Sequence, residues 1–219
     1  MSDIEQKAQD HLFHPALRFA ARAISVVFHP LFVPVYIAWF LIYIHQVFPA
    51  ARPYDQNLML LRFVVMYALF PLFTILLLRG LGFVQSVYLR TQKERIIPYV
   101  ACGLYYFWMW YVLRNQPQVP EVLELFSMAI FLAASAGLMA NNYFKISMHA
   151  LAAGVAVTFV LMLGLMSDTD FGVYISCAML AAGLVCTARL INNDHRPFDV
   201  YAGFVTGALS QVAAYWIVM

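Results

Sequence analysis

Seven long apolar runs constrain this chain more than any other feature of its 219 residues. Most of them are close to 20 residues long, which is the length an α-helix needs to cross the roughly 30 Å hydrocarbon core of a bilayer. The composition agrees, because 63% of the residues are hydrophobic and only 11% are charged, whereas about a quarter are charged in a typical soluble domain. A soluble enzyme, a disordered protein and a disulfide-stapled secreted module are therefore excluded. The runs cover residues 24–48, 58–82, 96–113, 121–140, 147–167, 171–191 and 198–218.

The predicted fold is all-α: a polytopic bundle of about seven transmembrane helices that forms a single domain over residues 23–219. Proline and aspartate break the chain between the runs, and no ten-residue alternating pattern indicates a β-barrel. Residues 1–22 mix polar and apolar side chains at helical spacing, so an amphipathic helix is expected there at the membrane interface. Pro30, Pro34 and Pro71 fall inside runs, where neighbouring helices can accommodate a kink. The small residues expected to let helices approach closely include Gly154, Gly164, Gly183, Gly203 and Gly207.

The basic residues predict which side of the membrane each end occupies. Seven spans place the two termini on opposite sides, and of the 13 Lys and Arg residues ten fall on the N-terminal side and three on the other. Cytoplasmic loops are enriched in Lys and Arg, so we expect a protein of the bacterial inner membrane with a cytoplasmic N-terminus. The net charge of +2 is too small to indicate a nucleic-acid partner, and no feature of the sequence indicates an oligomeric state.

Three polar clusters, which precede the third, fifth and seventh runs, would all lie on that N-terminal side. Ionisable groups near a bilayer are costly unless they are paired or hydrated, so they are candidates for function. In the strongest cluster, Pro197 is suited to the first turn of the last helix, which places His195 at the helix N-terminus and Asp199 one turn below it. A carboxylate there can hold one imidazole nitrogen and leave the other free to attack. Arg189, at the end of the preceding run, can present its guanidinium to a phosphate.

The other two clusters add a second histidine and more cations. Ser147 is a plausible N-cap of the fifth helix, which places His149 in the first turn, where backbone N–H groups favour an anion. A basic segment that contains Arg90, Lys93 and Arg95 enters the third run. Two histidines, one carboxylate and several cations form a set suited to phosphoryl transfer, and no carboxylate cage for a metal is present in the sequence.

These residues resemble the motifs of the type 2 phosphatidic acid phosphatase (PAP2) family, membrane lipid phosphatases that share an active site with vanadium haloperoxidases. The third family motif is matched by Arg189-x5-His195-x3-Asp199, with Ala188 where the family has Ser. The second is matched in part by Ile146-Ser147-Met148-His149, which keeps Ser and His but lacks Pro and Gly.

The first family motif is altered. When the chain is aligned on Pro98, Arg90 replaces the family Lys and Ile97 replaces the family Arg, so Lys93 or Arg95 would have to supply the missing cation.

The resemblance implies hydrolysis of a lipid phosphate monoester or diphosphate through a phosphohistidine, without a metal or other cofactor. His195 would attack phosphorus while Asp199 orients it, and His149 would protonate the leaving lipid oxygen. The substrate would come from the bilayer with its head group at the interface and its tails in lipid. The residues expected to hold the phosphate are Arg189, Arg90, Ser147, Lys93 and Arg95.

Plainer interpretations stand beside each of these roles. His195 and Asp199 would also be explained as an ordinary hydrogen-bonded pair, Ser147 as a helix cap alone, and the basic segment as positive-inside anchors. His29 and His45 have no partner in the sequence and are expected in packing or at the interface. The altered motifs leave open a protein that binds lipid phosphates without hydrolysing them. A small transporter is disfavoured because the polar residues gather at one face of the membrane.

Overall fold

The computed structural model describes residues 13–48, 52–84, 91–193 and 195–219, and within them the chain is helical, with no strand. The predicted all-α fold is confirmed. The first half of the chain forms α2 (Pro15–Val27), α3 (Val33–Trp39), the π-helix η1 (Phe40–Ile44), α4 (Pro53–Phe63), the π-helix η2 (Val64–Leu69) and α5 (Phe70–Gly80). The second half forms α6 (Gln92–Arg114), α7 (Glu121–Asn141), α8 (Met148–Met166), α9 (Gly172–Ile191) and α10 (Pro197–Val218).

Six helices of the described chain are long and apolar enough to cross a membrane, which agrees with a bundle of about seven spans. They are Pro53–Gly80, Gln92–Arg114, Glu121–Asn141, Met148–Met166, Gly172–Ile191 and Pro197–Val218. An integral membrane protein is the class that these helices indicate.

The first apolar run, 24–48, is divided between short helices. Residues 24–27 form the last turn of α2. A turn follows, and the apolar helix Val33–Ile44 contains most of the remaining residues. That helix has a length of only about 18 Å at 1.5 Å per residue, less than the bilayer core. The break coincides with Pro30, which has no N–H to donate and disfavours helical backbone at the residue before it. The predicted segment 1–22 is represented only by α2, because residues 1–12 lie outside the described residues.

Pro71 is accommodated within one continuous helix rather than at a break. The backbone immediately before it, η2, is π-helical, and the N–H of Phe70 donates to the carbonyl of Val65. A wider turn of this kind relieves the clash that a proline ring makes with the carbonyl four residues earlier.

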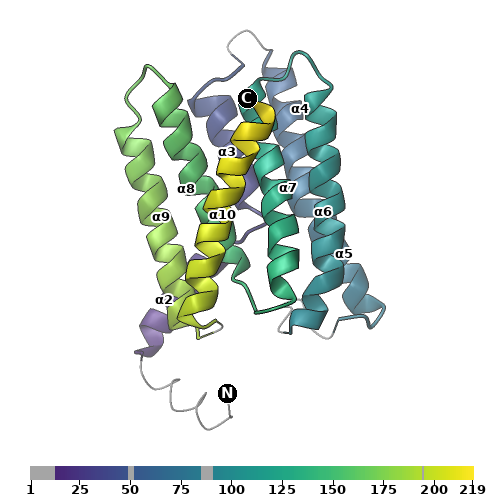
Figure 1. The fold of residues 1–219 in the computed structure, drawn as a ribbon, viewed down its shortest axis with the longest axis vertical. Helices are drawn as coiled ribbons and strands as arrows, with labels where there is room; N and C mark the ends of the chain where they lie inside the picture. The colour runs from purple at the N-terminus through teal and green to yellow at the C-terminus, as the bar shows by residue number, and fades with distance from the viewer. Residues whose placement is uncertain (1–12, 49–51, 85–90, 194) are drawn as a thin grey trace.

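The chain segments that carry the polar clusters lie at the same end of the bundle (Figure 1). The beginning of α6, the connection from α7 to α8 and the connection from α9 to α10 lie at the end where α2 is found, and α10 finishes at the opposite end. Residues that are about a hundred positions apart in the sequence therefore meet at one face, as the sequence predicts.

Glycines bring α8 and α10 into direct backbone contact. A Cβ at Gly207 would lie 2.0 Å from the carbonyl oxygen of Leu151, and one at Gly203 would lie 2.7 Å from that of Ser147. Only glycine permits such an approach, so two of the predicted close contacts are confirmed here. Gly183 differs, because a Cβ at that position would meet nothing within 4 Å. The tight contact places the N-terminal ends of α8 and α10, with His149 and His195, next to each other.

Candidate active site

A cavity of about 790 Å³ reaches the end of the bundle where the polar clusters meet. Its polar end is lined by four cationic residues, three histidines, Ser25 and Asn192, and the described residues that line it include no carboxylate. The cations and histidines are Arg22, Arg95, Lys145, Arg189, His29, His149 and His195. Four cationic side chains gathered in one lining favour an anionic ligand over a metal ion.

The ring of His195 is fixed by the backbone of a neighbouring loop. His195 lies just before Pro197, the first residue of α10, and its Nδ1–H donates to the carbonyl oxygen of Lys145 at 3.0 Å. Because the proton is on Nδ1, Nε2 carries none and keeps its lone pair. Burial, together with the nearby cations Arg189, Arg95 and Lys145, lowers the pKa of His195 to about 3. The imidazole is therefore neutral at physiological pH, as a nucleophile must be.

Asp199 does not hold the His195 ring, contrary to what its spacing predicts. Its buried carboxylate accepts a hydrogen bond from the backbone N–H of Arg196 at 3.0 Å. Asp199 lies in the first turn of α10, so this bond caps the N-terminus of that helix. A carboxylate in the first turn is within reach of unsatisfied backbone N–H groups, which compete with any side-chain partner. The backbone carbonyl of Asp199 also accepts from the N–H of Ser147 at 3.1 Å, which ties the starts of α8 and α10 together.

His149 is directed toward the end of α2. It lies in the first turn of α8, and its Nε2–H donates to the backbone carbonyl of Ser25 at 3.0 Å. Ser147 caps that helix, because its Oγ accepts from the N–H of Ala150 at 3.4 Å. Ser147 is fully buried and is not among the residues that line the cavity, so the structure shows its capping role and not a position facing a ligand.

Ser25 also contacts the end of α9. Its hydroxyl oxygen accepts from Nδ2 of Asn192 at 3.2 Å and from Nη1 of Arg189 at 3.4 Å. Next to it, the ring of His29 meets that of His149 edge-on, with the two centroids 5.3 Å apart. One face of the site is therefore formed by the end of α2 and the turn that follows it. One signal of this is present in the sequence, since Pro30 and Pro34 mark irregular backbone, which membrane proteins tolerate where it lines a cavity.

Among the described residues of the basic segment, Arg95 is the one that lines the cavity. It is buried, and its Nη1 donates to the carbonyl of Ile146 at 2.9 Å, which joins the start of α6 to the loop before α8. Lys93 is exposed and does not line the cavity, and Arg90 lies outside the described residues. Lys145, which the sequence did not single out as a phosphate ligand, also lines the cavity.

Beyond this polar end the cavity becomes apolar. Both Arg95 and Tyr106 line it, and a helix rises by about 16 Å between positions that far apart. The deeper walls are aliphatic and aromatic and come from α3, α5, α6, α7 and α8; among them are Phe126, Ile130 and Val155. A space with a cationic end and an apolar remainder matches an amphiphile with an anionic head group.

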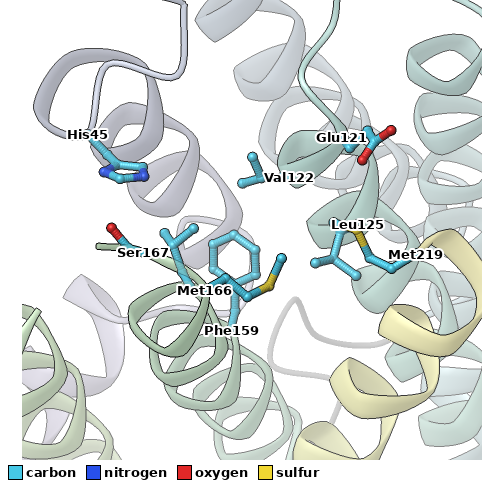
Figure 2. A pocket seen from close by; sticks show the side chains of 9 residues that line it. His45, Glu121, Val122, Leu125, Phe159, Met166, Ser167 and Met219 are labelled. Carbon is cyan, nitrogen blue, oxygen red and sulfur yellow. The ribbon is translucent and has the colours of Figure 1, made fainter. Parts of the chain in front are cut away.

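A second hollow, of about 330 Å³, contains His45 and Glu121 and has a different character. Figure 2 shows these two side chains at its rim, around the apolar side chains of Phe159 and Met166. It lies at the start of α7, the opposite end of the bundle from the clustered histidines, and the described residues that line it include no Lys or Arg. The chemistry of phosphate recognition is therefore concentrated in the first cavity.

Comparison with known proteins gave one match: the family model described as the PAP2 superfamily matches residues 110–219. The matched region contains α7 to α10, and therefore His149, Arg189 and His195. Arg95 and the end of α2 precede it. No curated protein and no solved structure matches the chain.

Proposed function

The chain belongs to the PAP2 superfamily, and from this we propose that it is a membrane-embedded phosphatase that hydrolyses a lipid phosphate monoester or diphosphate through a phosphohistidine. One observation carries the proposal. Two histidines with fixed rings, His195 and His149, share a cavity with the cations Arg189, Arg95 and Lys145, and that cavity continues into an apolar interior.

In the proposed first step the Nε2 lone pair of His195 attacks phosphorus, and the bond between phosphorus and the lipid oxygen breaks. His149, doubly protonated in the complex with the phosphate, gives one proton to that leaving oxygen, so a lipid alcohol departs and a phosphohistidine remains. In the second step His149 takes a proton from water as the water oxygen attacks phosphorus. The phosphorus–nitrogen bond breaks, inorganic phosphate leaves, and both rings return to their initial states.

The cations supply the electrostatic part of catalysis. Charge in phosphoryl transfer is spread over the non-bridging oxygens, and groups already held in place around them lower the barrier. Arg189 and Arg95 are anchored through Ser25 and through the carbonyl of Ile146, respectively. Their guanidinium groups therefore need little reorganisation when a phosphate binds. We assign phosphate binding to them together with Lys145; Arg90, which lies outside the described residues, stays a predicted contributor, whereas Lys93 does not line the cavity.

The apolar interior supports a lipid rather than a soluble phosphate ester as substrate. On the predicted topology the site faces the cytoplasm. This favours substrates made inside the cell, namely phosphatidate, phosphatidylglycerophosphate or an isoprenyl diphosphate.

The test is phosphate release from these three lipids by the purified protein in detergent containing a chelator. We expect turnover by the wild type and a loss of at least about a thousandfold in His195→Ala and in His149→Ala. His45→Ala, which changes a histidine at the opposite end of the bundle, is the matched control and should retain full activity.

Two outcomes would contradict this function. If no lipid is turned over while lipid phosphates still bind, the protein is a non-hydrolysing member of the superfamily. If turnover survives in His195→Ala, another residue is the nucleophile.

A further inference from the structure

The turn between α2 and α3 places a third histidine in the cavity. His29 lies where the apolar run is broken, and it lines the same space as His149, Arg189 and His195. Its position lies outside the region that matches the PAP2 superfamily, which begins at residue 110. Neither the family match nor the sequence motifs assign it a role.

The backbone fixes the tautomer of this ring. The N–H of Leu31 donates to Nδ1 of His29 at 3.3 Å, so Nδ1 is an acceptor and carries no proton. The ring is then the neutral form with its proton on Nε2. Among the described residues no acceptor is hydrogen-bonded to that Nε2–H.

The orientation of the ring is also restrained. His29 packs edge-on against His149 with an interplanar angle of 82°, and His149 is itself held by the carbonyl of Ser25. A ring restrained on one side by Leu31 and on another by His149 presents a donor at low entropic cost. An anion bound among the cations of the same lining would offer an acceptor to this Nε2–H.

We propose that His29 is a substrate-contacting residue whose Nε2–H donates to a non-bridging oxygen of the bound phosphate, beside Arg189. This rests on the proposed function, because it names a further ligand of the same phosphate. It also gives the first part of the chain a chemical role in a site whose other histidines come from α8 and from the connection before α10.

The decisive variant is His29→Phe, which keeps an aromatic ring against His149 but removes the donor. His29→Gln keeps an N–H donor without the ring. We expect competitive inhibition by inorganic phosphate to weaken about fivefold to tenfold in His29→Phe, the usual effect of losing one hydrogen bond to a ligand, and by less than about threefold in His29→Gln. His45→Phe is the matched control and should leave inhibition unchanged.

A second measurement separates this inference from the proposed function. Inorganic phosphate should raise the melting temperature of the wild type in detergent, because a ligand that binds only the folded state stabilises it. The increase should be smaller in His29→Phe whether or not the protein turns over any lipid. If His29→Phe does not fold, His29→Met provides the same comparison.

A packing role alone would give the opposite pattern. In that case His29→Phe would have the same inhibition constant for phosphate as the wild type and the same phosphate-induced rise in melting temperature. Only His29→Gln would be less stable than the wild type. That result would overturn the inference even if the wild type is an active phosphatase. A wild type that binds phosphate through His29 but releases none from lipids would instead remove the proposed function and leave His29 as a ligand of a bound, unhydrolysed phosphate.

Discussion

At the scale of single residues, the charge state of His195 is decided by its surroundings. Burial and the cations Arg189, Arg95 and Lys145 hold its pKa near 3 in the folded protein, whereas an unfolded histidine titrates near 6.5. Below about pH 6.5 the unfolded chain therefore takes up a proton that the folded protein does not, and this favours unfolding. The stabilising effect of a neutral His195 is complete above about pH 6.5 and is lost progressively toward pH 3.

We therefore expect the melting temperature in detergent to fall as the pH is lowered from about 8 to about 4, and to fall less steeply in His195→Asn. Asparagine retains an N–H donor for the carbonyl of Lys145 but does not titrate. The measurement is a series of thermal melts of both proteins across that pH range. Equal slopes for the two proteins would mean that His195 does not contribute to the acid sensitivity.

Asp199 gives a second prediction at this scale, because the structure shows it as a helix cap and not as a partner of His195. Asp199→Ala should cost about 1 kcal/mol of stability, the usual effect of losing a cap. Turnover should fall far less than in His195→Ala, since the carbonyl of Lys145 still holds the ring. Melting temperature and kcat, measured on the same preparation, test this. A loss of kcat as complete as that of His195→Ala would show that the carboxylate acts directly on the histidine.

At the scale of helices, the contact between α8 and α10 sets the geometry of the site. Gly207→Ala would place a methyl group against the carbonyl of Leu151, where a Cβ would lie only 2.0 Å from the oxygen. The two helices would have to separate, at a cost of about 1–3 kcal/mol or more. His149 and His195 stand at the starts of these helices, so both melting temperature and turnover should fall.

Gly183→Ala is the matched control for that substitution. It also replaces a glycine inside a helix, but a Cβ there meets nothing within 4 Å. It should leave turnover unchanged and stabilise the protein by about 0.5–1 kcal/mol, because alanine loses less backbone entropy than glycine in a helix. If both variants behave alike, close packing at Gly207 is not what holds the site together.

The helices also show how far the sequence alone could lead. Apolar runs and proline breakers report burial and backbone restrictions directly, so the helices after residue 52 were predictable, as was the meeting of the polar clusters at one end. The partners of the site residues were not. His195 and His149 are held by the carbonyls of Lys145 and Ser25, and every residue has a carbonyl, so no residue type announces such a contact. His29 lines the cavity because a turn interrupts the apolar run 24–48, which the sequence predicts as one transmembrane span.

At the scale of the whole molecule, the remaining question with a chemical consequence is which side of the membrane the site faces. The distribution of ten basic residues against three predicts that the end carrying the histidines is cytoplasmic. The connection after α7, which contains Asn142, lies at that end, and the connection between α6 and α7, which contains Gln118, lies at the other (Figure 1). Both residues are exposed, so single cysteines placed there can report accessibility.

In a background with Cys102, Cys177 and Cys186 replaced by alanine, a membrane-impermeant thiol reagent added to intact cells should label Gln118→Cys and not Asn142→Cys. Permeabilising the cells should make Asn142→Cys reactive. This would show that the membrane, and not burial within the protein, had protected that cysteine from the reagent. The reverse pattern would place the cavity on the outer face. The positive charges at that end would then reflect phosphate binding rather than topology, and the substrate would be a lipid phosphate presented at the outer leaflet.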